Sequence, residues 1–180
     1  DDLPDGGAAH FAATIHALRA RIPGVEVEVL IPDLQGDTTA LDIVLAAQPD
    51  ILNHNLETVA RLQPTVRPQA DYARSLGVLR YAAQAGARVK SGLMLGMGET
   101  REELMAALHD LRAAGVTLLT LGQYLAPSAA HHPVARFVPP EEFAALHEQA
   151  LALGFVAVAA GPQVRSSYHA GELVARGKVS

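Results

Sequence analysis

The chain has 180 residues, of which 49% are apolar, and a formal net charge of −5 at pH 7. This composition predicts a globular protein with one sizeable core, and it excludes a basic nucleic-acid surface and a membrane-spanning apolar run. The sequence contains no cysteine. The chain therefore offers neither a disulfide nor a thiolate ligand for a metal, and we expect a cytoplasmic location.

Apolar residues recur with a helical period at the start of the chain and with strand-like alternation afterwards. The opening helix is predicted to carry Phe11, Ile15, Leu18 and Ile22 on one face. Strands are predicted at residues 25–31, 51–52, 89–95, 117–121 and 155–160.

Capping residues mark the helix boundaries. Thr100 and Glu103 form a capping-box pattern, and a proline pair at residues 139–140 opens the last long helix. Glycine ends three helices directly before a strand, at Gly86, Gly115 and Gly154. These short turns predict βαβ units and a parallel sheet within a single domain, residues 1–180.

The predicted architecture is α/β and corresponds to a barrel without its first part. A complete eight-stranded barrel usually needs about 250 residues, and this sequence opens with a helix instead of a strand. We therefore expect an incomplete, N-terminally truncated barrel.

Polar residues follow every predicted strand, where parallel α/β proteins place their functional groups. The last cluster is the most informative, because a cation, two hydroxyls, a phenol and an imidazole follow an apolar run. Since the carboxyl ends of parallel strands meet at one edge, we expect all five clusters to face one cavity. They are residues 32–33 (Pro-Asp), 53–57 (Asn-His-Asn-Leu-Glu), 92–99 (glycine-rich), 122–124 (Gly-Gln-Tyr) and 165–170 (Arg-Ser-Ser-Tyr-His-Ala).

Several of these residues also fit a purely structural role. Asp33 and the asparagines suit turns, and the glycines ease packing as well as ligand approach. Arg67 and Arg74 are two helical turns apart and are expected to face one side, as surface charges or as a carboxylate clamp. The pair His131-His132 is expected in a surface loop, since no third ligand has metal-site spacing.

Taken together, these segments resemble the lipoyl synthases, which are radical S-adenosylmethionine (SAM) enzymes. Biotin synthases carry an element similar to residues 53–56, whereas Gly-Gln-Tyr-Leu at 122–125 and the serine segment at 165–170 favour lipoyl synthase. The matching segments are residues 1–8, 30–33, 53–58, 66–68, 70–72, 74–76, 90–96, 122–125 and 165–170.

The resemblance implies a partial (β/α)6 TIM-like barrel of the radical SAM type and a transferase reaction of lipoate biosynthesis and protein lipoylation. The family inserts two sulfurs, at C6 and C8, into an octanoyl group on a carrier protein. One [4Fe–4S] cluster binds and cleaves SAM, and a second [4Fe–4S] cluster is the sulfur source. The implied partners are an octanoylated lipoyl-carrier domain or H protein and an electron donor such as ferredoxin or flavodoxin. The implied location is a bacterial cytoplasm, with no nucleic acid and no membrane.

The resemblance also assigns site residues. Ser167 is the expected oxygen ligand of the second cluster, with Ser166 as the neighbouring alternative, in a segment of about residues 155–180. The residues expected to bind SAM are Asn53, Asn55, Glu57, Arg74, Arg67 and Gly96. The residues expected to line the substrate cavity are Asp33, Gln123, Tyr124 and Arg165.

The sequence departs from the family in one respect, because both cysteine triplets that hold the clusters are missing. We therefore expect the C-terminal part of a lipoyl synthase, beginning near the end of the second barrel strand. This chain alone is expected to be inactive and poorly stable at its open sheet edge. Two alternatives remain: a biotin synthase-like radical SAM sulfurtransferase, and a non-catalytic remnant that binds SAM or a carrier protein.

Overall fold

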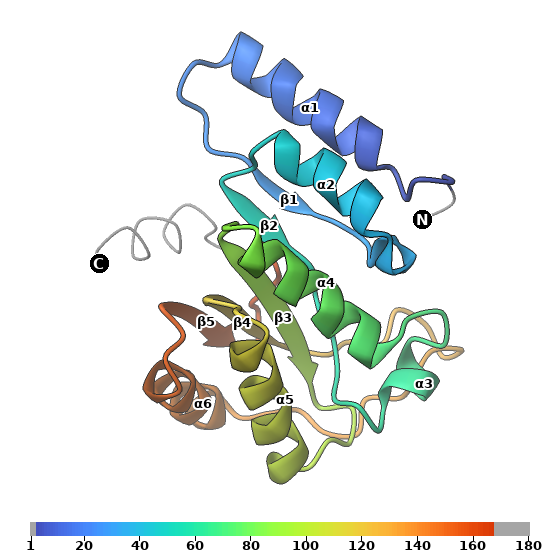
Figure 1. Cartoon of the computed structure of the whole chain (residues 1–180). Coiled ribbons are helices and arrows are strands. Elements are labelled where there is room, and N and C mark those ends of the chain that lie inside the picture. Colours follow the sequence, from blue (N-terminus) through green and yellow to red (C-terminus); the bar gives the residue numbers. More distant parts are fainter. Residues whose placement is uncertain (1–2, 168–180) are drawn as a thin grey trace.

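A computed structural model describes residues 3–167 and shows helices packed against a parallel sheet (Figure 1). The elements are α1 (Ala8–Arg21), β1 (Glu28–Leu30), the 3₁₀ turn η1 (Leu34–Gly36), α2 (Thr38–Ala46), β2 (Ile51–Asn53), α3 (Gln63–Val66), α4 (Tyr72–Gln84), β3 (Val89–Leu95), α5 (Arg101–Ala113), β4 (Leu118–Gln123), α6 (Pro140–Ala152) and β5 (Ala157–Gly161).

The five strands lie in the sheet in chain order, and every neighbouring pair is parallel. The predicted α/β class with a parallel sheet is therefore confirmed. Within the described part of the chain, β1 and β5 are the two edges, so the sheet is open and forms a partial barrel. The prediction of one domain over residues 1–180 stays a prediction.

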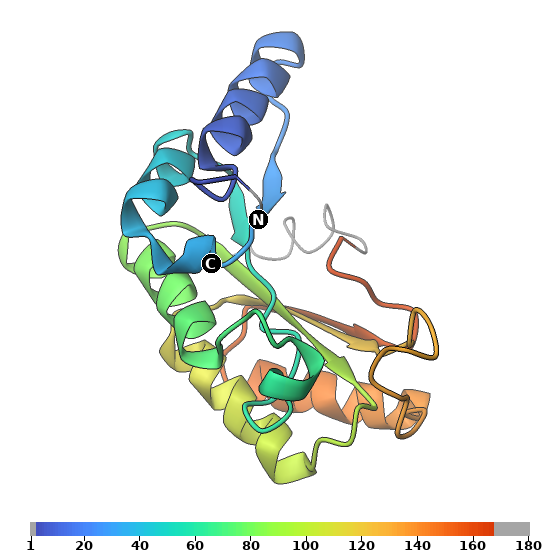
Figure 2. The ribbon, with the colours of Figure 1, turned by 90° about the vertical axis from the view of Figure 1, so that its right-hand side faces the viewer.

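The two faces of the sheet have different environments. Figure 2 shows α1, α2, α4 and α5 along one side, with the chain after β5 on the other side, which we call the inner face. The main core lies between the helices and the outward side chains of the strands, such as Val29, Leu52 and Leu119. The inner face carries a small apolar cluster of Ile51, Leu118 and Ala157 near the strand starts. Its remaining surface is available for polar groups.

The predicted caps are confirmed. Thr100 and Glu103 exchange both hydrogen bonds of a capping box at the start of α5. Gly86, Gly115 and Gly154 have φ of 85°, 88° and 92°, the left-handed conformation in which glycine is favoured at a helix end. These turns fix where β3, β4 and β5 begin.

Two predicted elements differ in detail from the structure. The first strand is assigned only to Glu28–Leu30, although Val27 and Ile31 still form ladder hydrogen bonds with the β2 region. Ala8 and Ile15 are fully buried in α1, whereas Leu18 and the C-cap residue Ile22 are 38% and 53% exposed. The opening helix is confirmed, and its predicted apolar face is buried only in part, because the helix packs mainly against α2.

Candidate functional site

A cavity of about 210 Å³ lies on the inner face, towards the carboxyl ends of the strands. Strand register explains why its residues meet: Gly92 pairs with Thr120 and Met94 with Gly122, and side chains two positions apart share a face. The sheet contributes Asn55, Glu57, Gly92, Leu93, Met94, Thr120 and Gly122, and the segment after β5 contributes Val164, Arg165 and Ser166. Four of the five predicted polar clusters therefore reach one cavity.

Asn55 and Glu57 place an amide beside a carboxylate in this cavity. Nδ2 of Asn55 donates to Oε1 of Glu57 at 3.2 Å, while the buried Oδ1 of Asn55 has no protein partner among the described residues. Burial raises the pKa of Glu57, and the charge of Arg67 and the Asn55 hydrogen bond oppose that shift. An unpaired amide oxygen and a carboxylate both accept hydrogen bonds, so the pair suits a ligand that presents two hydroxyls.

The backbone around Glu57 is held in an uncommon conformation. Glu57 has φ of 70°, which costs a non-glycine residue about 1–3 kcal/mol. Its N–H donates to the carbonyl of Gly92 at 2.9 Å, and its carbonyl accepts the N–H of Met94 at 2.8 Å. These two bonds to β3 fix the residue against the edge of the cavity. Backbone strain of this kind is concentrated at functional sites.

Two glycines form the floor of the cavity. A Cβ on Gly92 would stand 2.5 Å from Oγ1 of Thr120, and a Cβ on Gly122 would collide with the carbonyl of Val164. Thr120 and Val164 were not predicted as site residues. Thr120 lies on the strand predicted at residues 117–121, two positions before Gly122 of the polar cluster, and this period of two was the available signal. No sequence signal pointed to Val164.

The segment after β5 forms one wall of the cavity. Nη1 of Arg165 donates to the carbonyl of Gln123 at 3.4 Å, and Ser166 lies against the cavity. Ser167 follows as an exposed residue. The rest of the predicted cluster, residues 168–170, lies outside the described residues. The structure therefore places Ser166 at the cavity, and Ser167 is its neighbour in the chain.

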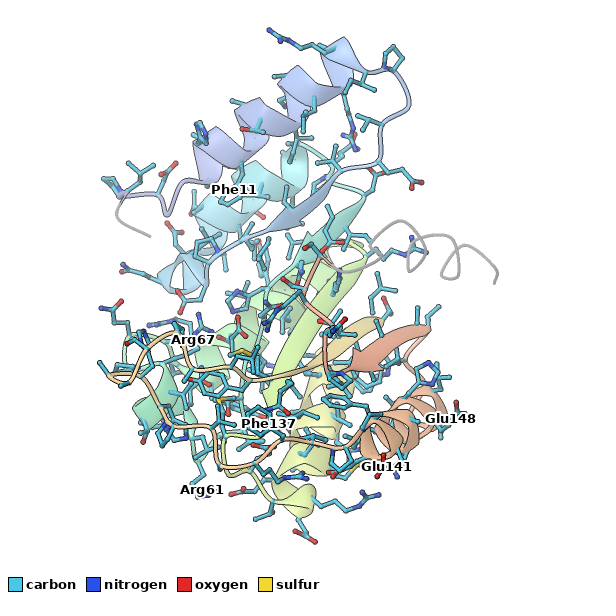
Figure 3. All side chains as sticks on the ribbon, turned by 180° about the vertical axis from the view of Figure 1, so that it is seen from behind. Phe11, Arg61, Arg67, Phe137, Glu141 and Glu148 are labelled. Carbon is cyan, nitrogen blue, oxygen red and sulfur yellow. The ribbon has the colours of Figure 1, made fainter. Side chains whose placement is uncertain are left out.

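A second, larger cavity of about 940 Å³ lies beside the first and is lined by the N-terminal loop, the turn after β1 and the loop between α3 and α4. It holds Asp33, Arg67 and Arg74, and Nε of Arg74 donates to Oδ2 of Asp33 at 2.7 Å. Arg67, labelled in Figure 3, also donates through Nη1 to the carbonyl of Asn55 at 3.3 Å. Arg67 therefore links the two cavities.

The two arginines share this cavity for a reason other than helical spacing. Arg67 caps the end of α3, whereas Arg74 lies in α4. Pro68 follows Arg67, and proline disfavours a helical conformation in the residue before it. The expectation that the two side chains lie two turns apart on one helix was therefore wrong.

The cluster at residues 53–57 divides between the two sides of the sheet. His54 is buried beside α4: Nδ1 contacts the carbonyl of Ile31 and Nε2 contacts Oγ of Ser75, both at 3.0 Å. Burial lowers the pKa of His54. Asn53 lies on the inner face, where Nδ2 donates to Oε1 of Glu28 at 3.0 Å, but it does not line the cavity.

Gln123, Tyr124 and Gly96 hold the loop before α6 and do not line either cavity. Gln123 donates to the carbonyls of Tyr124 and Arg136 and accepts the N–H of Val138 at 2.8 Å. The hydroxyl of Tyr124 donates to the carbonyl of His132 at 2.8 Å. Gly96 has φ of 95°, and a Cβ there would collide with Arg136 and Gln123. In the structure these residues position a loop.

Metal-ligating side chains are not gathered within residues 3–167, where no group of three or more His, Cys, Asp or Glu could hold an ion. His131 lies in an exposed loop, as predicted, whereas Nε2 of His132 contacts the carbonyl of Met97 at 2.8 Å. None of the helices in this part of the chain is both long and apolar enough to span a membrane.

Comparison with known proteins connects this geometry to a family. A family model described as "Radical SAM superfamily" matches residues 1–111. A lipoyl synthase of Rubrobacter xylanophilus is 55% identical over 174 residues, which cover 96% of this chain and 54% of that protein. A lipoyl synthase of Thermus thermophilus is 58% identical over 173 residues, with coverage of 94% and 54%. The chain therefore spans about half the length of these curated relatives.

A solved structure shows a similar fold at low sequence identity. The crystal structure of methylornithine synthase (PylB) matches 82% of this chain and 44% of that protein, with a TM-score of 0.66 and 15% identity. At that identity the likeness supports the fold, including the partial-barrel arrangement of sheet and helices, and does not extend to a substrate.

Proposed function

The chain belongs to the radical SAM superfamily, and from this premise we propose that the whole protein is a lipoyl synthase. The proposed reaction inserts two sulfurs, at C6 and C8, into an octanoyl group carried by a protein. The observation that carries the proposal is the identity of more than half of all aligned residues with curated lipoyl synthases over almost the entire chain. These relatives do not favour the alternative of a biotin synthase-like enzyme.

Membership of the superfamily implies SAM and a [4Fe–4S] cluster, and the inner-face cavity fits part of SAM. The unpartnered Oδ1 of Asn55 and the carboxylate of Glu57 supply acceptors for the ribose hydroxyls. The bare backbone of Gly92 lets an adenosine group approach the sheet closely. When bound, SAM would supply a primary carbon radical for hydrogen abstraction, formed with release of methionine when its sulfonium accepts one electron that the reductant delivers through the cluster.

We assign the carboxylate of SAM to the arginines beside this cavity. Arg67 is the better placed of the two, because its Nη1 already reaches the carbonyl of Asn55. Nε of Arg74 donates to Asp33 at 2.7 Å and Nη2 donates to the carbonyl of Gln69 at 3.0 Å, so Arg74 has fewer donors left for a ligand. The remaining proposed SAM residues, Asn53 and Gly96, would act indirectly through the backbone they support.

This chain offers no cysteine thiolate for an iron–sulfur cluster. Within residues 3–167, no group of three or more His, Cys, Asp or Glu could hold an ion. Two clusters, the octanoylated carrier and the reductant such as ferredoxin or flavodoxin are parts of the proposal for the whole protein, as is a bacterial cytoplasmic location. The contribution proposed for this chain is one oxygen ligand, Ser167, with Ser166 as the alternative. An alkoxide is a harder ligand than a thiolate, which suits an iron that must be released.

Two serine variants of the intact protein test the proposal. Ser167→Ala is expected to abolish formation of the lipoyl group while leaving reductive cleavage of SAM measurable, because only the second cluster loses a ligand. Ser166→Ala is the matched control and should retain both activities. Normal lipoyl yield in Ser167→Ala would overturn the ligand assignment, and absence of SAM cleavage in the unaltered protein would overturn the proposed function.

A further inference from the structure

Lys90 is a fully buried lysine whose side chain is 0% exposed. It lies on the inner face near the start of β3 and pairs in register with Asn53 of β2. Its ammonium lies 2.8 and 3.0 Å from the two carboxylate oxygens of Glu28 on β1. A third contact leaves the sheet: Nζ also donates to the backbone carbonyl of Ser166.

Three neighbouring strands build this contact. Asn53 adds a hydrogen bond from Nδ2 to Oε1 of Glu28 at 3.0 Å, so the carboxylate is held by two side chains. The ammonium has three donors, and the carboxylate and the Ser166 carbonyl use them. The side chain that contacts Ser166 is therefore fixed by its own partners, and it is not a flexible surface lysine.

The backbone that Lys90 contacts carries the proposed iron ligand. The carbonyl of Ser166 lies between the Ser166 side chain, which lines the cavity, and Ser167. From Val164 to Ser166 the chain crosses the inner face, since the Val164 carbonyl lies against Gly122 and the Ser166 carbonyl against Lys90. Among the described residues, two other bonds hold this segment: the Val164 N–H donates to the carbonyl of Gly161 at 3.1 Å, and Arg165 donates to the carbonyl of Gln123 at 3.4 Å.

We propose that Lys90 is a positioning residue that fixes the two serines beside the cavity through the carbonyl of Ser166. Glu28 and Asn53 in turn hold Lys90. That one of these serines binds iron rests on the proposed function. The contact of Lys90 with the Ser166 carbonyl does not depend on that function. Lys90 would act on neither SAM nor substrate directly.

Tryptic cleavage of the Arg165–Ser166 bond tests this role, because proteolysis in a folded protein follows the population of the locally opened segment. In the intact protein, without cofactor, Lys90→Met is expected to raise the rate of this cleavage at least tenfold, measured by mass spectrometry. The Arg112–Ala113 bond at the end of α5 is the internal reference for global unfolding. The expected change is in the ratio of the two rates.

Three further variants make the result decisive. Arg61→Met is the matched control, since Arg61 (Figure 3) also contacts one carboxylate, Glu103, and one backbone carbonyl, that of Gly98; its ratio should stay within twofold of the unaltered protein. Glu28→Gln keeps Lys90 as a donor and leaves an amide oxygen as its acceptor, so this variant should also keep a low ratio. The double variant Lys90→Met/Glu28→Gln removes the unpaired buried carboxylate and should still show the raised ratio.

The outcomes separate this inference from the proposed function. An unchanged ratio in Lys90→Met and in the double variant would overturn the positioning role. An equal rise in Glu28→Gln would assign the effect to the ion pair and overturn it as well. Neither result depends on a bound cluster or on SAM, so failure of the lipoylation test would leave the cleavage result standing.

Discussion

Gly92 lies directly under Asn55: a Cβ added to Gly92 would stand 3.0 Å from Oδ1 of Asn55, and 2.5 Å from Oγ1 of Thr120. The unpartnered amide oxygen and the floor of the cavity therefore occupy one small space. A larger side chain at position 92 would therefore reduce the space for SAM in the proposed site.

Gly92→Ala is accordingly expected to weaken binding of S-adenosylhomocysteine at least tenfold, measured by calorimetry in the intact protein. Overpacking of a filled site costs about 1–3 kcal/mol of stability, and the melting temperature should fall. Gly77→Ala is the matched control, because a Cβ there meets nothing within 4 Å and alanine favours the α4 helix by about 1 kcal/mol. Equal binding by Gly92→Ala and the unaltered protein would contradict the placement of the ligand.

Glu57→Ala is expected to reduce the same affinity by about 10- to 100-fold. A hydrogen bond to a charged group contributes about 1.5–3 kcal/mol, and about 1.4 kcal/mol corresponds to a factor of ten. Glu103→Ala is the control, since that carboxylate pairs with Arg61 at the surface and lies outside both cavities. If both variants bind equally well, Glu57 does not contact the ligand.

Gln123→Leu is expected to release the loop before α6. The change removes the acceptor for the Val138 N–H and the donor to the carbonyls of Tyr124 and Arg136. Each buried group left unsatisfied costs about 1–3 kcal/mol. Hydrogen exchange of the Val138 amide should accelerate by more than tenfold, whereas the exposed Gln163→Leu should not change it. Unchanged exchange would show that the loop is held by other contacts.

The pH dependence of stability should carry a signature of His54. Burial holds the pKa of His54 below its ordinary value of about 6.5. Below that pH the unfolded chain binds a proton that the folded protein does not, so the free energy of unfolding falls as pH drops. Burial raises the pKa of Glu57, so this residue has the opposite effect. Its contribution to the free energy of unfolding falls as pH rises.

Urea unfolding at about pH 7.5 and about pH 5.5 measures this difference. His54→Gln should flatten the loss of stability on acidification, and the exposed His10→Gln should leave it unchanged. An identical slope in His54→Gln and the unaltered protein would show that His54 is protonated equally in both states.

The architecture was accessible from the sequence because its signals are local. The capping box at Thr100, the glycine ends at residues 86, 115 and 154, and the alternation in the strands each depend on nearby residues alone. The resemblance to lipoyl synthases was likewise contained in short segments. The exposure of Leu18 and Ile22 had no local signal, because neighbouring elements decide which part of a helical face is covered.

The tertiary structure decided which polar residues share a cavity. Asn55, Glu57 and Gly92 were predicted together, but Thr120 and Val164 join them only through strand register and the path of the chain after β5. Gln123 belonged to the same polar pattern, yet its side chain turns to the loop before α6.

The sequence by itself determined the alternation of helices and strands, the family and the absence of thiolate ligands, since these follow from residue identity and local spacing. Only the tertiary structure placed Lys90 against the carbonyl of Ser166. The two residues are separated by 76 positions, and their contact depends on three strands aligned in register and on the chain crossing the inner face. Long-range contacts of that kind have no local signal, because they arise from packing of the whole sheet.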